Sequence, residues 1–223
     1  MAIRFNLGEH RHTDIIAHST PHFPTRTGEE FLELLRAIAA SPAGTPSPSL
    51  VEQFLGSHPA ALAFVQAPKP ITASFATTTY WGLNAHLLVD AEGKQTPFRY
   101  QIHPVAGDHK LDDAAVKEKS PHFLLDEIKK RVSISSVELK VVAQIGEEGD
   151  VTDDVTVHWP DDRRLVELGT VRLDSLEKDD AKLQKRIIFD PIARVDGIKA
   201  SDDPLLEMRA AVYLISGKGR RAD

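Results

Sequence analysis

Two side chains near the C-terminus have a spacing that can support metal chemistry. Arg209 and Tyr213 are four residues apart in a segment whose pattern predicts a helix, so they lie on one helix face. There the guanidinium can donate hydrogen bonds to the phenolic oxygen. A permanent cation next to a phenol favours the phenolate, which is a hard anionic ligand suited to ferric iron. The pair alone does not distinguish a metal ligand from an ordinary packing contact.

A second set of candidate ligands lies near the N-terminus, where histidines are crowded. They are His10, His12, His18 and His22. With a carboxylate such as Glu9 or Asp14 they can complete a nonhaem metal site. Pro21 separates His18 from His22, so these two are not ligands on one helical turn. The favoured interpretation is therefore a group of exposed histidines without a metal.

Helices are predicted towards both ends of the chain. The last helix, from Pro204 to about Ile215, follows Ser201-Asp-Asp-Pro204, which offers capping groups and acidic residues for the positive end of a helix. Thr27-Gly-Glu-Glu30 has the spacing of a capping box, and apolar residues then recur at helical intervals to about Ala40. Two short helices are predicted to begin at residues 49 and 57 and to end before residue 67. Two more are predicted over 111–119 and 120–132.

Between these helices the sequence has the texture of β-strands. An alternating segment opens the chain, and a turn at Asp90-Ala-Glu-Gly93 predicts an antiparallel hairpin. Strands are predicted over 1–6, 74–80, 86–89, 98–103, 137–145, 165–173 and 186–189. The predicted fold class is α+β, a single domain over residues 1–223 with an antiparallel sheet or barrel as its core and helices packed outside it.

Composition excludes several classes of function. The 223 residues carry a net charge of −6 without a long basic block, which argues against a nucleic-acid or anionic-membrane partner. The chain contains no run of about 18 apolar residues, so no membrane-spanning helix is predicted. Because the chain has no cysteine, thiolate metal sites, iron–sulfur clusters and cysteine nucleophiles are excluded. A redox function would need a cofactor held by oxygen or nitrogen.

Several segments around these candidates resemble one known family. They are Phe189-Asp-Pro191, Asp196-Gly197-Ile198, Ser201-Asp-Asp-Pro204, Arg209-Ala-Ala-Val-Tyr213 and Lys218-Gly-Arg220-Arg221. Together they resemble the proximal haem segment of the catalase superfamily. Asp14-Ile-Ile-Ala-His-Ser-Thr-Pro21 is similar to the distal segment of catalases, and residues 74–82 and 87–93 to their central barrel strands. The short chain and Ala61-Leu-Ala-Phe-Val-Gln-Ala-Pro68 most resemble the small catalase-related peroxidases.

This resemblance implies haem b as the cofactor and assigns roles on its proximal side. Tyr213 is expected to be the axial ligand of the haem iron, with Arg209 as its charge partner. Asp203 is expected in the relay that holds the guanidinium, and Asn84 stands where the family has a histidine of that relay. Arg220 is expected to pair with a haem propionate, a contact that suits a guanidinium.

On the distal side, the resemblance places Phe31 over the haem face and Phe23 in the same pocket. His18 stands where the family has an asparagine, and a histidine is suited to move the protons of peroxide, so it is a candidate substitute base. The family's own distal histidine and two arginines that contact propionates precede the segment resembling Met1–Phe5. These residues have no counterpart in this sequence, and we expect a barrel that lacks its first part.

The leading functional hypothesis is a haem-dependent peroxidase. It would reduce hydrogen peroxide or organic hydroperoxides and oxidise small electron donors, with weak or no catalase activity. Three alternatives stay open: an allene-oxide-type haem protein that converts fatty-acid hydroperoxides, a non-catalytic haem-binding protein, and a barrel that binds an apolar ligand without iron. A homo-oligomer is possible. A cytoplasmic location is favoured, and a periplasmic one stays open because an export signal would lie upstream of Met1.

Overall fold

The computed structural model describes residues 1–9 and 11–222, and its centre is a six-stranded sheet. The strand order is β7-β6-β5-β4-β8, with β3 also paired to β5, and each of these pairs is antiparallel. The strands are β3 (Tyr80–Trp81), β4 (His86–Val89), β5 (Gln95–Pro104), β6 (Val137–Ile145), β7 (Leu165–Leu173) and β8 (Ile198–Ala200). The hairpin predicted around residues 90–93 is formed by β4 and β5.

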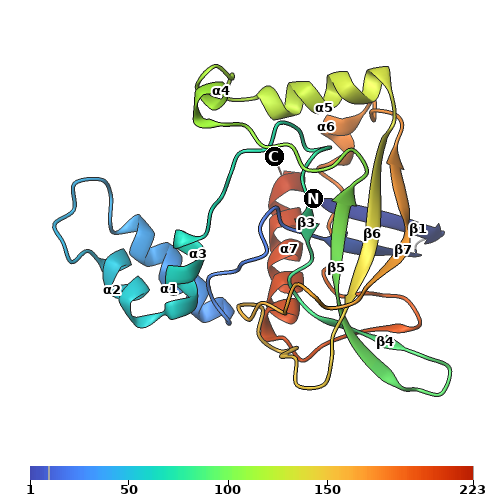
Figure 1. Ribbon diagram of the computed structural model, residues 1–223, viewed down its shortest axis with the longest axis horizontal. Coiled ribbons are helices and arrows are strands. Elements are labelled where there is room, and N and C mark those ends of the chain that lie inside the picture. The colour runs from blue at the N-terminus through green and yellow to red at the C-terminus, as the bar shows by residue number, and fades with distance from the viewer. Residues whose placement is uncertain (10, 223) are drawn as a thin grey trace.

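A second, two-stranded sheet consists of β1 (Ala2–Gly8) and β2 (Arg11–Ile16). It is linked to the larger sheet where His18 and Trp81 exchange backbone hydrogen bonds of 2.8 and 2.7 Å. Figure 1 shows this ribbon crossing next to β5, β6 and β7. Ile15 of β2 belongs to the main core together with alternate residues of β5 and β6, which are Phe98, Tyr100, Ile102, Leu139, Val141 and Ala143.

Three helices near the N-terminus form a small unit with its own core. They are α1 (Gly28–Ala39), α2 (Leu50–Ser57) and α3 (Pro59–Gln66), which pack around Leu34, Ala37, Phe54 and Ala61. The predicted capping box of Thr27 and Glu30 is formed at the start of α1. In Figure 1 this unit lies to the left of α7 (Pro204–Ala222), with the sheet on the other side of that helix. The other helices are α4 (Asp113–Lys117), α5 (Phe123–Ile134) and α6 (Asp180–Leu183).

Two of the predicted strands are wrong. In the segment 74–80, only Tyr80 belongs to a strand, because hydroxyl and carboxylate side chains take up the backbone groups. The amide of Ala76 donates to the hydroxyl of Ser74 at 2.9 Å, and that of Thr79 to Asp108 at 2.6 Å. The segment 186–189 is not a strand either: no described strand pairs with it, and it contacts α7 through Arg220, which donates to the carbonyl of Ile187, and through Ile188, which lies against Gly217.

The barrel expected from the sequence is not confirmed. The described strands form an open six-stranded sheet and a separate ribbon, whereas the mixture of helices and antiparallel strands agrees with the predicted α+β class. The last helix is longer than predicted, running to Ala222 instead of about Ile215. Over the ranges 1–9 and 11–222, no helix is long and apolar enough to cross a membrane.

Candidate functional site

The C-terminal helix α7 brings Arg209 and Tyr213 together. Nη2 of Arg209 donates to the phenolic oxygen of Tyr213 at 2.9 Å, and its Nε lies 3.2 Å from the same oxygen. These are the contacts that the four-residue spacing allows. The guanidinium thus presents one edge to the phenol, and its other nitrogen, Nη1, points towards the sheet.

That nitrogen donates to the side-chain oxygen of Asn84, which is buried in the break between β3 and β4. The chain can lie tightly against β5 there because residue 82 is glycine: a Cβ at Gly82 would lie 3.0 Å from Cβ of Tyr100. The amide nitrogen of Asn84 donates in turn to Oδ2 of Asp203 at 2.8 Å. Because arginine only donates and a carboxylate only accepts, these two neighbours fix the orientation of the amide.

Asp203 ends this chain of hydrogen bonds and also starts α7. Its Oδ1 accepts from the backbone N–H of Leu205 at 2.9 Å, and only 3% of the residue is exposed. Burial raises the pKa of the Asp203 carboxyl, although the hydrogen bonds from Leu205 and Asn84 act in the opposite direction. The structure therefore contains a continuous relay from a buried carboxyl through an amide and a guanidinium to the phenol of Tyr213.

Tyr213 lines two cavities. The larger, of about 590 Å³, is walled mainly by apolar side chains of α1, α7 and the segment before α1, namely Phe23, Phe31, Leu32, Leu35, Leu205, Met208 and Val212, with His18, Glu29 and Arg209. The smaller, of about 250 Å³, is lined by Ala2, Ile16, Phe189, Ser216 and Arg220. The helices α1 and α7 can approach closely because residue 28 is glycine: a Cβ there would lie 2.8 Å from Cγ of Met208.

The three predicted distal residues share the larger cavity. The rings of Phe23 and Phe31 are stacked with centroids 5.6 Å apart, and His18 meets Phe23 edge-on at 6.0 Å. Burial, followed by the positive charges of Arg209 and the N-terminal ammonium, lowers the pKa of His18 to about 4. The imidazole of His18 is therefore neutral at neutral pH and can accept a proton or a hydrogen bond.

Arg220 lies two helical turns beyond Tyr213 and lines the smaller cavity with it. Its guanidinium donates to the hydroxyl of Ser216 at 2.8 Å and to the carbonyl of Ile187 at 2.7 Å. These two contacts hold the cation at the mouth of that cavity and leave further N–H donors on the guanidinium.

The nonhaem alternative finds no support in the described part of the chain, where no three histidine, aspartate or glutamate side chains gather to hold a metal. His12 lies 4.0 Å from a carboxylate oxygen of Asp14, but that carboxylate accepts two hydrogen bonds from Arg4. His10 lies outside the described residues. His18 is only partly exposed and lines the larger cavity, so the interpretation of the group as exposed histidines does not hold for this residue.

Sequence reasoning did not identify two buried polar residues next to the relay. His86 of β4 lines a small cavity together with Asn84 and Arg209, and Arg99 of β5 is a buried cation whose charge acts on Asp203. The position of His86, two residues after Asn84, was a usable signal. No sequence pattern near Arg99 indicates that it is buried next to the relay, because its hydrogen-bond partners come from the loop 151–157.

The residues fit a haem group. Tyr213 offers a phenolic oxygen stabilised by a cation, and the adjoining walls expose large apolar side chains, with 47% of Leu32, 47% of Leu35 and 48% of Val212 accessible. Apolar walls around a few convergent polar groups are typical of a cofactor site. Comparison with known proteins points the same way, because a family model of catalases matches residues 1–221.

The chain belongs to the catalase family. Among its relatives, the catalase-related peroxidase of Synechococcus elongatus is 31% identical over 220 residues, which cover 97% of this chain and 65% of that protein. The catalase-related peroxidase of Mycolicibacterium paratuberculosis is 32% identical over 223 residues, covering 99% and 70%. The chain therefore spans about two-thirds of the length of these relatives.

Two solved structures share the fold of this family member. A fungal catalase superposes with a TM-score of 0.83 at 18% identity, covering 98% of this chain and 47% of the other. A bacterial catalase gives 0.79 at 21% identity, covering 98% and 45%. At these identities the likeness concerns the fold alone.

Proposed function

We propose that this catalase-family chain is a haem b peroxidase that reduces hydrogen peroxide or organic hydroperoxides and oxidises small electron donors, with weak or no catalase activity. The observation that carries the proposal is the relay from Asp203 through Asn84 and Arg209 to Tyr213, whose side chain lines both cavities. The names of the two peroxidase relatives support the same reaction class.

On the proximal side, the chain's residues would hold the iron of a bound haem. Tyr213 would bind it through the phenolic oxygen, and Arg209 would keep that oxygen oriented and offset its negative charge. Asn84 and Asp203 fix the guanidinium, since each hydrogen bond in the relay has only one possible donor. Arg220 pairs with a propionate at the mouth of the smaller cavity. When bound, haem iron supplies the cleavage of the peroxide O–O bond.

On the distal side, Phe23 and Phe31 wall the larger cavity with apolar rings. His18 faces the same space as a neutral imidazole, so it takes a proton from peroxide or donates a hydrogen bond that orients it. A hydroperoxide with an apolar substituent would meet Leu32 and Leu35 at this wall.

The test is reconstitution with haem b and comparison with Tyr213→Phe. We expect a high-spin ferric spectrum that is lost or strongly changed in the variant. Tyr80→Phe is the matched control, since the hydroxyl of Tyr80 bonds the carbonyl of Phe75 and does not line either cavity. An unchanged spectrum in Tyr213→Phe would overturn the ligand assignment. Bound haem without donor oxidation by either class of peroxide would instead favour a non-catalytic haem-binding protein.

A further inference from the structure

His86 is a buried histidine that the proposed mechanism does not use. It is 7% exposed, and its ring lies against those of Phe98 and Tyr100, with centroid distances of 5.9 and 5.6 Å. Its Nε2 lies 3.3 Å from the carbonyl oxygen of Pro191. Across residues 1–9 and 11–222, no atom meets hydrogen-bond geometry with its other ring nitrogen, Nδ1. A buried polar atom in this state carries a free-energy cost and calls for a partner.

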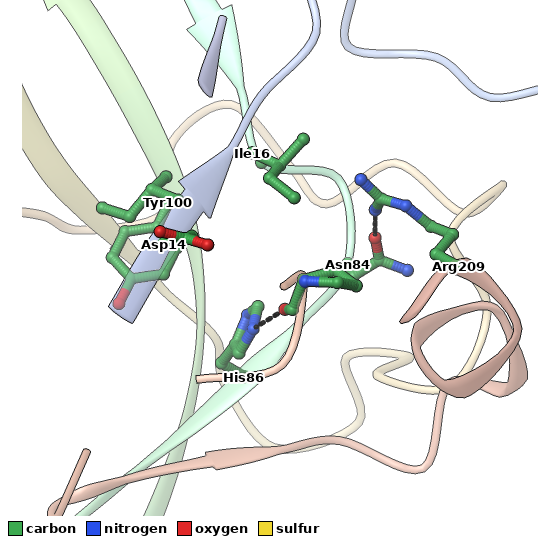
Figure 2. A pocket seen from close by; sticks show the side chains of 9 residues that line it. Asp14, Ile16, Asn84, His86, Tyr100 and Arg209 are labelled. Atoms are coloured by element: carbon green, nitrogen blue, oxygen red, sulfur yellow. Dashed lines mark hydrogen bonds between the residues drawn. The ribbon is translucent and has the colours of Figure 1, made fainter. Parts of the chain in front are cut away.

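Nδ1 belongs to a side chain that lines a small cavity. The cavity measures about 10 Å³ and is bounded by residues of β2, the β3–β4 break, β5 and α7, among them Asp14, Asn84, Tyr100 and Arg209. That volume is close to what one water molecule needs. Figure 2 shows the imidazole below Asn84 and the guanidinium of Arg209 beyond it.

The groups around this cavity differ in what they can still bind. The carboxylate of Asp14 is taken up by Arg4 and by the amide of Asp190. Arg209 has five N–H donors, of which three are used by Tyr213 and Asn84. The guanidinium therefore has N–H groups that can donate to a further acceptor.

The protonation state of His86 determines what its Nδ1 can bind. Burial lowers the pKa of the imidazole, and the charge of Arg209 acts in the same direction, while the carbonyls of Pro191 and Asn84 act against it. A neutral imidazole that donates from Nε2 to Pro191 leaves Nδ1 as an acceptor. An acceptor on one side and a donor on the other are what a bridging water requires.

We propose that the cavity holds one ordered water molecule, which accepts a hydrogen bond from Arg209 and donates one to Nδ1 of His86. His86 is then a positioning residue: through the water it holds the guanidinium from a third side, in addition to Tyr213 and Asn84. The water site rests on the geometry alone, and its effect on the iron rests on the proposed function.

The experiment compares the wild type with His86→Phe and His86→Gln. Phenylalanine keeps a ring between Phe98 and Tyr100 but removes the acceptor, whereas glutamine keeps an acceptor. His103→Phe is the matched control, because this histidine of β5 has its own partner in Gln101 at 2.8 Å and does not line the cavity.

Two readouts use the chain without haem. In a crystal structure that resolves ordered waters, we expect density for one water in the wild type and none in His86→Phe. In ¹⁵N NMR spectra of histidine side chains, we expect protonation at Nε2 and a hydrogen-bonded, unprotonated Nδ1. The absence of density in the wild type, or a proton on Nδ1, would overturn the water site whether or not haem binds.

The third readout uses the haem-loaded protein. Without the bridging water the guanidinium binds the phenolate less firmly, and a phenolate with more free charge lowers the reduction potential of the iron. We expect a more negative potential in His86→Phe, at least partial rescue in His86→Gln and no change in His103→Phe. An unchanged potential in His86→Phe would refute the positioning role, whereas failure of the wild type to bind haem would count against the proposed function and leave the two haem-free readouts intact.

Discussion

Replacing Asn84 with leucine removes both hydrogen bonds that join Arg209 to Asp203 and keeps a side chain of similar size. The two partners are then left with charges that face an apolar group. Asp203 is 3% exposed, and within residues 1–9 and 11–222 the one hydrogen-bond donor left to its carboxyl is the N–H of Leu205, at 2.9 Å. Arg209 is partly exposed, so water can replace the lost acceptor on its side.

The magnitude follows from this difference in burial. A hydrogen bond to a charged group contributes roughly 1.5–3 kcal/mol, so the loss at Asp203 counts in full and the loss at Arg209 only in part. We expect the variant to lose about 2–4 kcal/mol of unfolding free energy at neutral pH. The loss should be smaller in acid, because a protonated Asp203 accepts a weaker hydrogen bond than an ionised one.

The assay is urea denaturation of the haem-free chain, with Asn6→Leu as the control. Asn6 is the other asparagine, and it is exposed in β1, so its replacement should change the stability by less than about 0.5 kcal/mol. Equal midpoints for Asn84→Leu and the wild type would refute the conclusion that the relay is a rigid, buried network.

Two further changes test other parts of the site. His18→Gln should remove part of the pH dependence of stability. In the wild type the folded pKa of His18 is about 4, below the usual 6.5, so the unfolded chain binds the proton first and the free energy of unfolding rises as the pH rises between these values. Urea titrations at several pH values should show a steeper rise for the wild type than for the variant. Gly217→Ala should lower the free energy of unfolding by about 1–3 kcal/mol, measured by thermal denaturation, because a Cβ at this position would meet the side chain of Ile188. The double change Gly217→Ala with Ile188→Ala should be less than additive, and strict additivity would show that the two residues do not compete for this space.

Local signals account for the parts of the fold that sequence reasoning predicted well. The capping box at Thr27 and the one at Ser49 fix helix starts through side chains only three residues away. The hairpin of β4 and β5 and the Arg209–Tyr213 contact depend on equally short spacings. Such features require no knowledge of the remaining chain.

The wrong strands fail for a shared reason, since their β-rich residues are used for other contacts. In the segment 74–79 the side-chain oxygens of Ser74 and Asp108 bind the backbone in place of a neighbouring strand. In 186–189, Ile188 fills the space that Gly217 leaves on α7. The sequence pattern predicts the strand at the N-terminus but not its partner β2, although Gly8 stands at the end of β1, where a hairpin signal is expected.

The relay depends on contacts that no local pattern predicts. Asn84 and Asp203 are 119 positions apart, and Asn84 and Arg209 are 125 apart. Only the resemblance to a family placed these residues together before the structure did. The cavities are likewise products of tertiary packing, because their walls come from α1, α7 and the first two strands.

An amide at position 84 has a consequence for how the relay responds to pH. Unlike an imidazole, the side chain of Asn84 neither gains nor loses a proton, so the charge beside Tyr213 depends on Arg209 and Asp203. Burial raises the pKa of Asp203, which extends the range over which this carboxyl is protonated. Within that range Asp203 carries no negative charge to offset the guanidinium that contacts the phenol. As the pH rises through the folded pKa of Asp203, the new carboxylate offsets part of the positive charge through the fixed amide. The charge near the phenol of Tyr213 therefore depends on pH through a residue that does not touch it.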